Sequence, residues 1–164
     1  MNILDEALKI EEQGERLYRS FARDASDKGA NYIFDWLADQ EHKHHAIFQR
    51  MKEGGHVPDV KSADLKGVRD IFSGWKDVRP GLDIKTDQVE LYRQALVVEE
   101  KSVALYEEGA HIAADEPARS VFLRIAAEEK AHQQIMENII DLVTRPDFWA
   151  ENAEFGYRGE DYYL

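Results

Sequence analysis

The sequence carries two glutamate–histidine pairs in helical stretches whose same face is otherwise apolar. In the first pair Glu41 stands three residues before His44, and in the second Glu129 stands three residues before His132. Residues three apart project from the same face of a helix. A carboxylate buried in such a face without a partner costs several kcal/mol, so each pair must meet a neutralising group inside the protein.

An internal repeat links these pairs to two further glutamates. Sliding the chain by 88 positions superposes one half on the other. The shift places the candidate residues of the first half on those of the second: Glu11 on Glu99, Tyr18 on Tyr106, Glu41 on Glu129 and His44 on His132. Each half is therefore predicted to be a helical hairpin with the same arrangement of acids and imidazole.

Four helices must position these residues. Apolar residues recur at helical spacing in four long segments, and no stretch sustains the alternation of a strand, which predicts an all-α fold. The predicted helices span about residues 2–25, 30–53, 86–113 and 117–143. They form one domain over residues 1–145, followed by an aromatic C-terminal tail over 146–164. Residues 54–85 are a long crossover with at most one short helix, around 64–72.

The long crossover follows from the way the two hairpins must pack. A pseudo-twofold arrangement sends the second and third helices in the same direction, so their connection travels the bundle's length of roughly 33 Å. Residues 54–85 can span that distance at up to about 3.3 Å per residue. In this arrangement the acids of all four helices stand at nearly the same height, and the six side chains meet in one layer.

Two divalent cations would neutralise such a layer. Their four positive charges balance four carboxylates and leave both imidazoles neutral, as metal ligation requires. Six ligands for two ions leave open coordination positions, which suits chemistry with oxygen or peroxide better than a closed structural site. Oxygen ligands with one imidazole per ion favour iron or manganese over zinc. The alternative is a metal-free bundle with buried glutamate–histidine hydrogen bonds.

Two other Glu-x-x-His matches lie outside this layer. Glu53 and His56 are separated by two glycines at a helix end. Glu108 and His111 have neither an acid nor an imidazole as counterparts under the 88-residue shift. Both matches are interpreted as accidental.

Two tyrosines accompany the acids. Tyr18 and Tyr106 stand two helical turns beyond Glu11 and Glu99 on the same helix faces. They are candidate catalytic residues, because their hydroxyls could bond to the ligand carboxylates or carry radical chemistry. A core tyrosine with a satisfied hydroxyl is the alternative interpretation.

A glycine and a serine occupy matching places beside the layer. Gly14 stands three residues after Glu11, and Ser102 stands three residues after Glu99. Glycine inside a helix costs about 0.5–1 kcal/mol. An open space through which a small oxidant reaches the metals would explain Gly14, and close helix packing would explain it equally well.

Charge and composition exclude several classes of partner. A net charge of -12 argues against nucleic acid and anionic membrane surfaces, since both require clustered Lys and Arg. No apolar run approaches the roughly 20 residues of a membrane span, and the amino terminus lacks a signal-peptide pattern, so a cytoplasmic location is expected. The absence of cysteine excludes thiolate nucleophiles and metal sites held by sulfur.

The ligand pattern resembles that of a known superfamily. One glutamate on each of two helices, with Glu-x-x-His on each of the other two, is the pattern of ferritin-like di-iron carboxylate bundles. The spacing of Glu and Tyr in the first and third helices, together with DQEHKH and EEKAH in the second and fourth, is similar to the rubrerythrin branch. The resemblance covers about residues 2–143, and the tail segment RPDFWAENAEF also resembles the end of small rubrerythrin-type domains.

This resemblance implies a ferritin-like four-helix bundle that binds two irons per chain. It implies that Glu41 and Glu129 bridge the irons, and that the remaining ligands each bind one of them: Glu11, Glu99, His44 and His132. The implied activity is reduction of hydrogen peroxide or dioxygen with oxidation of Fe(II), of peroxidase or ferroxidase type, in proteins that are often homodimers. The alternatives are a manganese catalase-like site, an iron-binding or storage protein, and a metal-free interaction bundle.

The sequence departs from the family pattern in two places. Full-length rubrerythrins carry a rubredoxin-like domain with four cysteines, whereas this sequence has none, so the electron donor is expected to be external, such as a rubredoxin-like protein. Peroxide-reducing members also have a further glutamate three residues after the ligand of the third helix, where this chain has Ser102. The resemblance therefore supports the di-metal site more firmly than it supports peroxidase activity.

Overall fold

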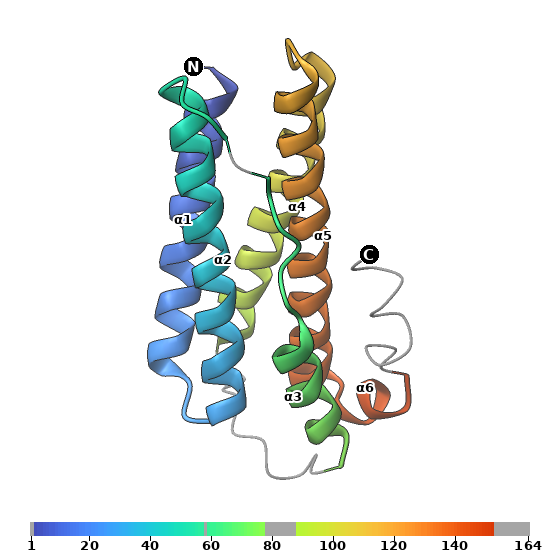
Figure 1. Cartoon of the computed structure of the whole chain (residues 1–164). Helices are drawn as coiled ribbons and strands as arrows, with labels where there is room; N and C mark the ends of the chain where they lie inside the picture. Colours follow the sequence, from blue (N-terminus) through green and yellow to red (C-terminus); the bar gives the residue numbers. More distant parts are fainter. Residues whose placement is uncertain (1, 58, 78–87, 153–164) are drawn as a thin grey trace.

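The computed structural model describes residues 2–57, 59–77 and 88–152, and this part of the chain is helical without strands. Helices α1 (Ile3–Asp24) and α2 (Lys28–Lys52) form one antiparallel hairpin, and α4 (Val89–Ile112) and α5 (Glu116–Thr144) form the other (Figure 1). Two shorter helices, α3 (Lys66–Asp77) and α6 (Pro146–Asn152), lie in the crossover and after the second hairpin. The predicted all-α four-helix bundle is confirmed.

Capping side chains explain where three of the four long helices begin. The side-chain oxygens of Asn2, Asp27 and Asp115 accept hydrogen bonds from backbone N–H groups in the first turns of α1, α2 and α5. Such bonds satisfy donors that have no partner within the helix. Helix α2 therefore begins at Lys28, directly after its cap, rather than near Ala30 as predicted. Thr86, the predicted cap of the third long helix, lies outside the described residues.

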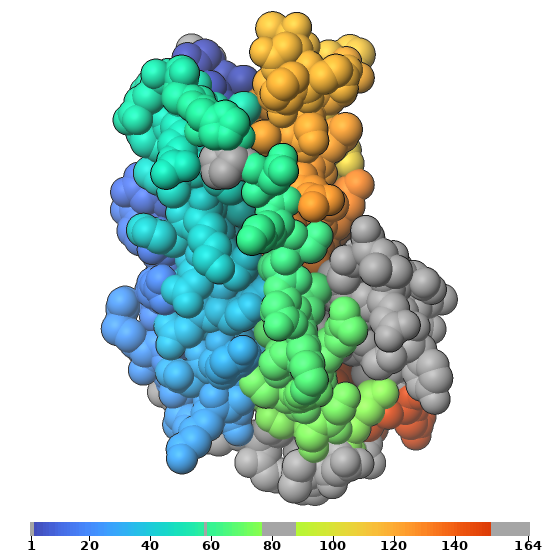
Figure 2. Space-filling model, viewed as in Figure 1, coloured from blue at the N-terminus to red at the C-terminus, as the bar shows by residue number. Residues whose placement is uncertain are grey.

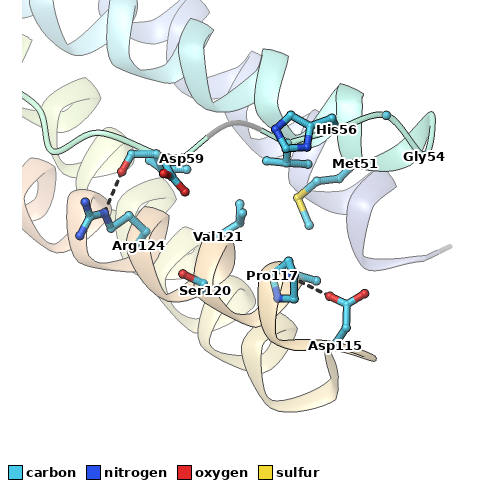
Figure 3. A pocket seen from close by; sticks show the side chains of 13 residues that line it. Met51, Gly54, His56, Asp59, Asp115, Pro117, Ser120, Val121 and Arg124 are labelled. Atoms are coloured by element: carbon cyan, nitrogen blue, oxygen red, sulfur yellow. Dashed lines mark hydrogen bonds between the residues drawn. The ribbon is translucent and has the colours of Figure 1, made fainter.

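The two hairpins run in the way that a long crossover requires. Helices α2 and α4 point in the same direction, and the chain between them returns along the bundle through α3 (Figure 1). On one face this crossover covers the seam between α2 and α5 (Figure 2). Its early part is fixed to α5 because the Arg124 Nε donates to the carbonyl oxygen of Val60 at 2.8 Å (Figure 3). That contact borders a cavity of about 710 Å³ between the end of α2 and the start of α5.

The apolar core is split into two clusters, and the predicted ligand layer lies between them. On α2, Ala38 belongs to one cluster and Phe48 to the other, with Glu41 and His44 between the two. On α5 the order is reversed, because Ala126 shares a cluster with Phe48. The bundle therefore closes the polar layer on both sides with packed side chains that exclude water.

The first part of the predicted aromatic tail forms α6 and covers the bundle end of its own chain. Trp149 is 2% exposed, and its indole Nε1 donates to the side-chain oxygen of Asn138 on α5. Its neighbour Phe148 is 46% exposed and lies against the guanidinium of Arg145. The other aromatic residues of the predicted tail, in 153–164, lie outside the described residues. In the part of the chain that the structure describes, no helix is long and apolar enough to cross a membrane.

Replacing Trp149 by alanine should lower the free energy of unfolding by about 3 kcal/mol, because a buried indole and its hydrogen bond to Asn138 are lost. Phe148→Ala is the matched control, since this neighbouring ring is half exposed, and it should cost about 1 kcal/mol or less. Urea unfolding monitored by circular dichroism measures both. Equal effects of the two substitutions would contradict the role of α6 as a cover of the bundle end.

Candidate metal centre

The six predicted ligands meet in one layer in the middle of the bundle. One glutamate comes from α1, one from α4, and a glutamate–histidine pair from each of α2 and α5. All six side chains are at most 1% exposed: Glu11, Glu41, His44, Glu99, Glu129 and His132. Four glutamates and two imidazoles are thus enclosed together, away from solvent.

The layer contains two overlapping groups of possible metal ligands. Each group has four residues whose ligand atoms all lie within 4.8 Å of one another. Glu11 and His44 belong to the first group, and Glu99 and His132 to the second. Glu41 and Glu129 belong to both groups, with the result that these two carboxylates stand between two neighbouring positions for a cation.

Both imidazoles turn the same nitrogen toward the carboxylates. The His44 Nδ1 lies 2.8 Å from Glu129 Oε1 and 3.5 Å from Glu11 Oε2. The His132 Nδ1 lies 2.8 Å from Glu41 Oε1 and 3.1 Å from Glu129 Oε2. The two rings stack with their centroids 5.7 Å apart. In each half Nδ1 is therefore the nitrogen placed to bind a cation, and Nε2 points away from the layer.

Two tyrosines connect the hairpins through the acids. The Tyr18 hydroxyl on α1 donates to Glu99 on α4, and the Tyr106 hydroxyl on α4 donates to Glu11 on α1. Burial, together with the neighbouring carboxylates, raises the pKa of both phenols well above the ordinary value. Both hydroxyls therefore keep their protons at neutral pH and hold the two carboxylates in place.

The acids are too close to be ionised together without compensation. Burial and the charges of Glu11 and Glu99 raise the pKa of Glu129 to about 8. Burial and the charge of Glu129 raise the pKa of Glu41 well above its ordinary value. Burial opposes ionisation of Glu11 as well, but the nearby imidazole of His44 lowers the pKa of that carboxyl overall.

The histidines are shifted by the same charges. Burial disfavours the imidazolium form, but the carboxylates around each ring outweigh it and raise the pKa of His44 and His132 well above the ordinary value. In the absence of cations the layer thus achieves neutrality by keeping protons. Cation binding must displace those protons, because only deprotonated carboxylates and neutral imidazoles act as ligands.

Carboxylate oxygens without a hydrogen-bond partner indicate whether cations fit into the layer. The second carboxylate oxygen, Oε2, of Glu11, Glu99 and Glu129 is buried and makes no hydrogen bond, although the Nδ1 of His132 lies 3.1 Å from the Glu129 atom. A buried acceptor without a donor costs about 1–3 kcal/mol, so three in one layer require an explanation. Cations between the carboxylates would satisfy all three. Oxygen ligands with one imidazole per position are a donor set that iron and manganese accept.

Gly14 does not open a space beside the layer. A Cβ atom at this position would lie 2.6 Å from Glu41 Oε2 and 3.2 Å from its carboxyl carbon, so the space is filled by that carboxylate. Of the two explanations offered by the sequence, close packing is therefore the one that accounts for the glycine, and the open space for a small oxidant is wrong. Ser102, its counterpart, is also buried, and its hydroxyl donates to the carbonyl oxygen of Val98 within α4.

Sequence reasoning missed one residue of the site. The Nε2 of His44 lies 2.5 Å from Oε2 of Glu128, which precedes the predicted ligand Glu129 on α5. Glu128 corresponds to Gln40 under the 88-residue shift, so the repeat that identified the other acids contains no signal for it. A further ring contact was also not predicted: the edge of Trp36 meets His132, with 5.7 Å between the centroids.

The two accidental glutamate–histidine matches stay apart from the layer. Among the described residues, neither Glu53 with His56 nor Glu108 with His111 belongs to a group of possible metal ligands. The carboxylate of Glu53 instead accepts a hydrogen bond from Gln49 one turn earlier on α2.

Comparison with known proteins identifies one family. The family model for rubrerythrin matches residues 2–140, which includes all six side chains of the layer. No curated protein matches the chain, and no solved structure matches it.

The metal-free protein should lose stability as the pH rises from about 5 to 8. The folded state keeps a proton on Glu129 up to about pH 8, whereas the unfolded chain releases it near the ordinary value, so folding becomes less favourable across this range. The raised pKa values of both histidines act in the same direction. Urea unfolding of chelator-treated protein at several pH values measures the slope.

In that experiment Glu129→Gln should reduce the pH dependence, while Glu100→Gln, on the exposed side of α4, should leave it unchanged. Stability that rises between pH 5 and 8 would contradict the assigned protonation of the layer.

Gly14→Ala should weaken metal binding, because the added methyl group displaces the Glu41 carboxylate. Gly74→Ala on α3 is the control, since nothing lies within 4 Å of its added Cβ atom. The control should gain about 0.5–1 kcal/mol of stability and bind metal like the wild type. Calorimetric metal titration and urea unfolding separate the two effects, and unchanged metal affinity in Gly14→Ala would refute the packing role of this glycine.

Proposed function

The chain belongs to the rubrerythrin family, and we propose that it is a non-haem di-iron oxidoreductase, of peroxidase or ferroxidase type, which reduces hydrogen peroxide or dioxygen while Fe(II) is oxidised. The observation that carries this proposal is the pair of overlapping ligand groups that share Glu41 and Glu129. Two cations at neighbouring positions can act on one small oxidant, whereas an isolated structural site has no need of shared carboxylates.

The ligand roles follow from group membership. Glu41 and Glu129 would serve both irons, because their carboxylates lie in both groups. Each remaining ligand belongs to one group, and so Glu11 and Glu99 would each hold one iron. The imidazoles of His44 and His132 would each bind through Nδ1, the nitrogen that faces the carboxylates.

Two irons bound in this layer would supply two electrons and open coordination positions for an oxidant. Two electrons and two protons convert one hydrogen peroxide into two waters. Oxidation of two Fe(II) ions to Fe(III) would supply those two electrons. The bundle contributes a dry site, because the apolar clusters on both sides exclude water from the layer. Release of the protons displaced from Glu41 and Glu129 makes the ligands anionic when the cations arrive.

Tyr18 and Tyr106 hold the carboxylates that bind a single iron. Each phenol donates across the hairpin interface, which limits the orientations open to Glu99 and Glu11. Because the raised pKa keeps both phenols protonated, they act as donors rather than as bases. They are also oxidisable side chains hydrogen-bonded directly to the ligands, which supports them as the candidates for any radical step.

Electrons that return the iron to Fe(II) come from outside this sequence. The 164 residues contain no cysteine and hence no rubredoxin-type iron site. We propose an external donor, such as a rubredoxin-like protein, acting on a homodimer in the cytoplasm. Ser102 stands where peroxide-reducing relatives have a further glutamate, so iron oxidation does not involve exchange of a carboxylate at that position.

Anaerobic titration with Fe(II), followed by peroxide or air, tests the proposal. The wild type should bind two irons per chain and develop the absorption of oxo-bridged ferric iron after oxidation. Glu129→Ala should lose both irons, because this carboxylate serves both positions, whereas Glu100→Ala, whose exposed side chain lies outside both groups, should bind two.

Other outcomes of this experiment identify the alternatives. Saturation at one iron, or none, contradicts the di-iron assignment. Peroxide disproportionation by manganese-loaded but not iron-loaded protein would indicate a catalase-like site. A hollow multi-subunit shell that accumulates many irons per chain would indicate storage.

A further inference from the structure

The imidazole of His44 is held from both sides. Its Nδ1 lies 2.8 Å from Glu129 Oε1 within the ligand layer, and its Nε2 lies 2.5 Å from Glu128 Oε2 on the outer side. The side chain of Glu128 is 12% exposed, so this contact is largely shielded from water. A carboxylate at Nε2 accepts the N–H from that nitrogen and fixes the ring orientation, so that Nδ1 faces the layer and offers its lone pair once a cation has displaced its proton.

The other half of the bundle lacks this contact. The Nε2 of His132 is buried and has no hydrogen-bond partner. Its ring meets the edge of Trp36, which offers packing but no charge. The position equivalent to Glu128 is Gln40, whose amide does not reach the imidazole. The approximate twofold symmetry of the ligands is therefore broken at the atoms behind the two imidazoles.

The asymmetry extends to the surface. Glu128 and His44 line a cavity of about 550 Å³ between α2 and crossover residues 59–64. Figure 2 shows the crossover over the seam between α2 and α5, and its residues 59–64 line this cavity. His44 is the one predicted ligand among the residues that line this cavity. The imidazole of His44 and its partner Glu128 thus border the cavity, whereas His132 does not.

We propose that Glu128 is a positioning residue that makes the two metal positions unequal. Glu128 orients His44 and increases the basicity of its Nδ1. The metal position formed with Glu11 and His44 therefore has a higher affinity for its ion than the position formed with Glu99 and His132. The proposal rests on the di-metal site of the proposed function. It adds an order of binding, in which the first ion enters the half of the site that borders the cavity.

Anaerobic calorimetric titration with Fe(II) tests this order. The wild type should bind two ions in two resolved steps. Glu128→Ala should weaken the tighter step by about 10- to 100-fold and leave the weaker step in place, because the orienting carboxylate acts on one imidazole. Glu128→Gln should have a smaller effect, since its amide oxygen still accepts the N–H bond but carries no charge. Gln40→Ala, the matched change in the other half, should leave both steps unchanged.

A spectroscopic measurement separates positioning from a general loss of structure. With one equivalent of ⁵⁷Fe(II), the Mössbauer spectrum of the wild type should contain one ferrous doublet, whereas Glu128→Ala should distribute the iron over two. Circular dichroism of the metal-free variants confirms their folding.

Binding of both ions in one indistinguishable step by the wild type, equal weakening of both steps in Glu128→Ala, or an equal effect of Gln40→Ala would overturn the proposal. A protein that shows the predicted order of binding but reduces neither oxidant would overturn the proposed activity and support this inference.

Discussion

Mutual repulsion among four carboxylates enclosed in one layer is the constraint on which the rest of the structure depends. Burial and the neighbouring charges raise the pKa of Glu41 and of Glu129, so that the layer is neutral only with bound protons or with bound cations. Protons leave several carboxylate oxygens without a donor, whereas two dications would neutralise the charge and occupy those oxygens at once. The enclosed carboxylates that destabilise the metal-free protein are therefore the groups that would bind the cations.

The fold places the glutamates of four helices at the same height along the bundle. Capping side chains such as Asp27 and Asp115 set where helices begin, and the register of each hairpin follows from those starting points. The crossover returns along the bundle and permits the second hairpin to repeat the first (Figure 1). Tyr18 and Tyr106 connect one hairpin to the other through the acids, so that the hydrogen bonds between the hairpins are also part of the site.

The repeat made much of the site predictable from sequence, because a twofold arrangement requires equivalent residues at equivalent heights. The prediction from the repeat missed the residue at which the two halves differ. Glu128 has Gln40 as its counterpart, and its partner His44 belongs to the opposite hairpin, so no spacing along the chain indicates their contact. The role of Gly14 could not be predicted for a related reason. Whether the missing side chain leaves a space or makes room for Glu41 depends on the side-chain conformation of Glu41, on the neighbouring helix.

Anomalous diffraction at the iron edge, from crystals grown anaerobically with Fe(II), tests the central claim most directly. The account predicts two peaks per chain in the buried layer, each in contact with both Glu41 and Glu129. One peak should adjoin Nδ1 of His44 and the other Nδ1 of His132. A single peak in the layer, or peaks confined to acidic groups on the surface, would contradict the claim that paired cations neutralise this cluster.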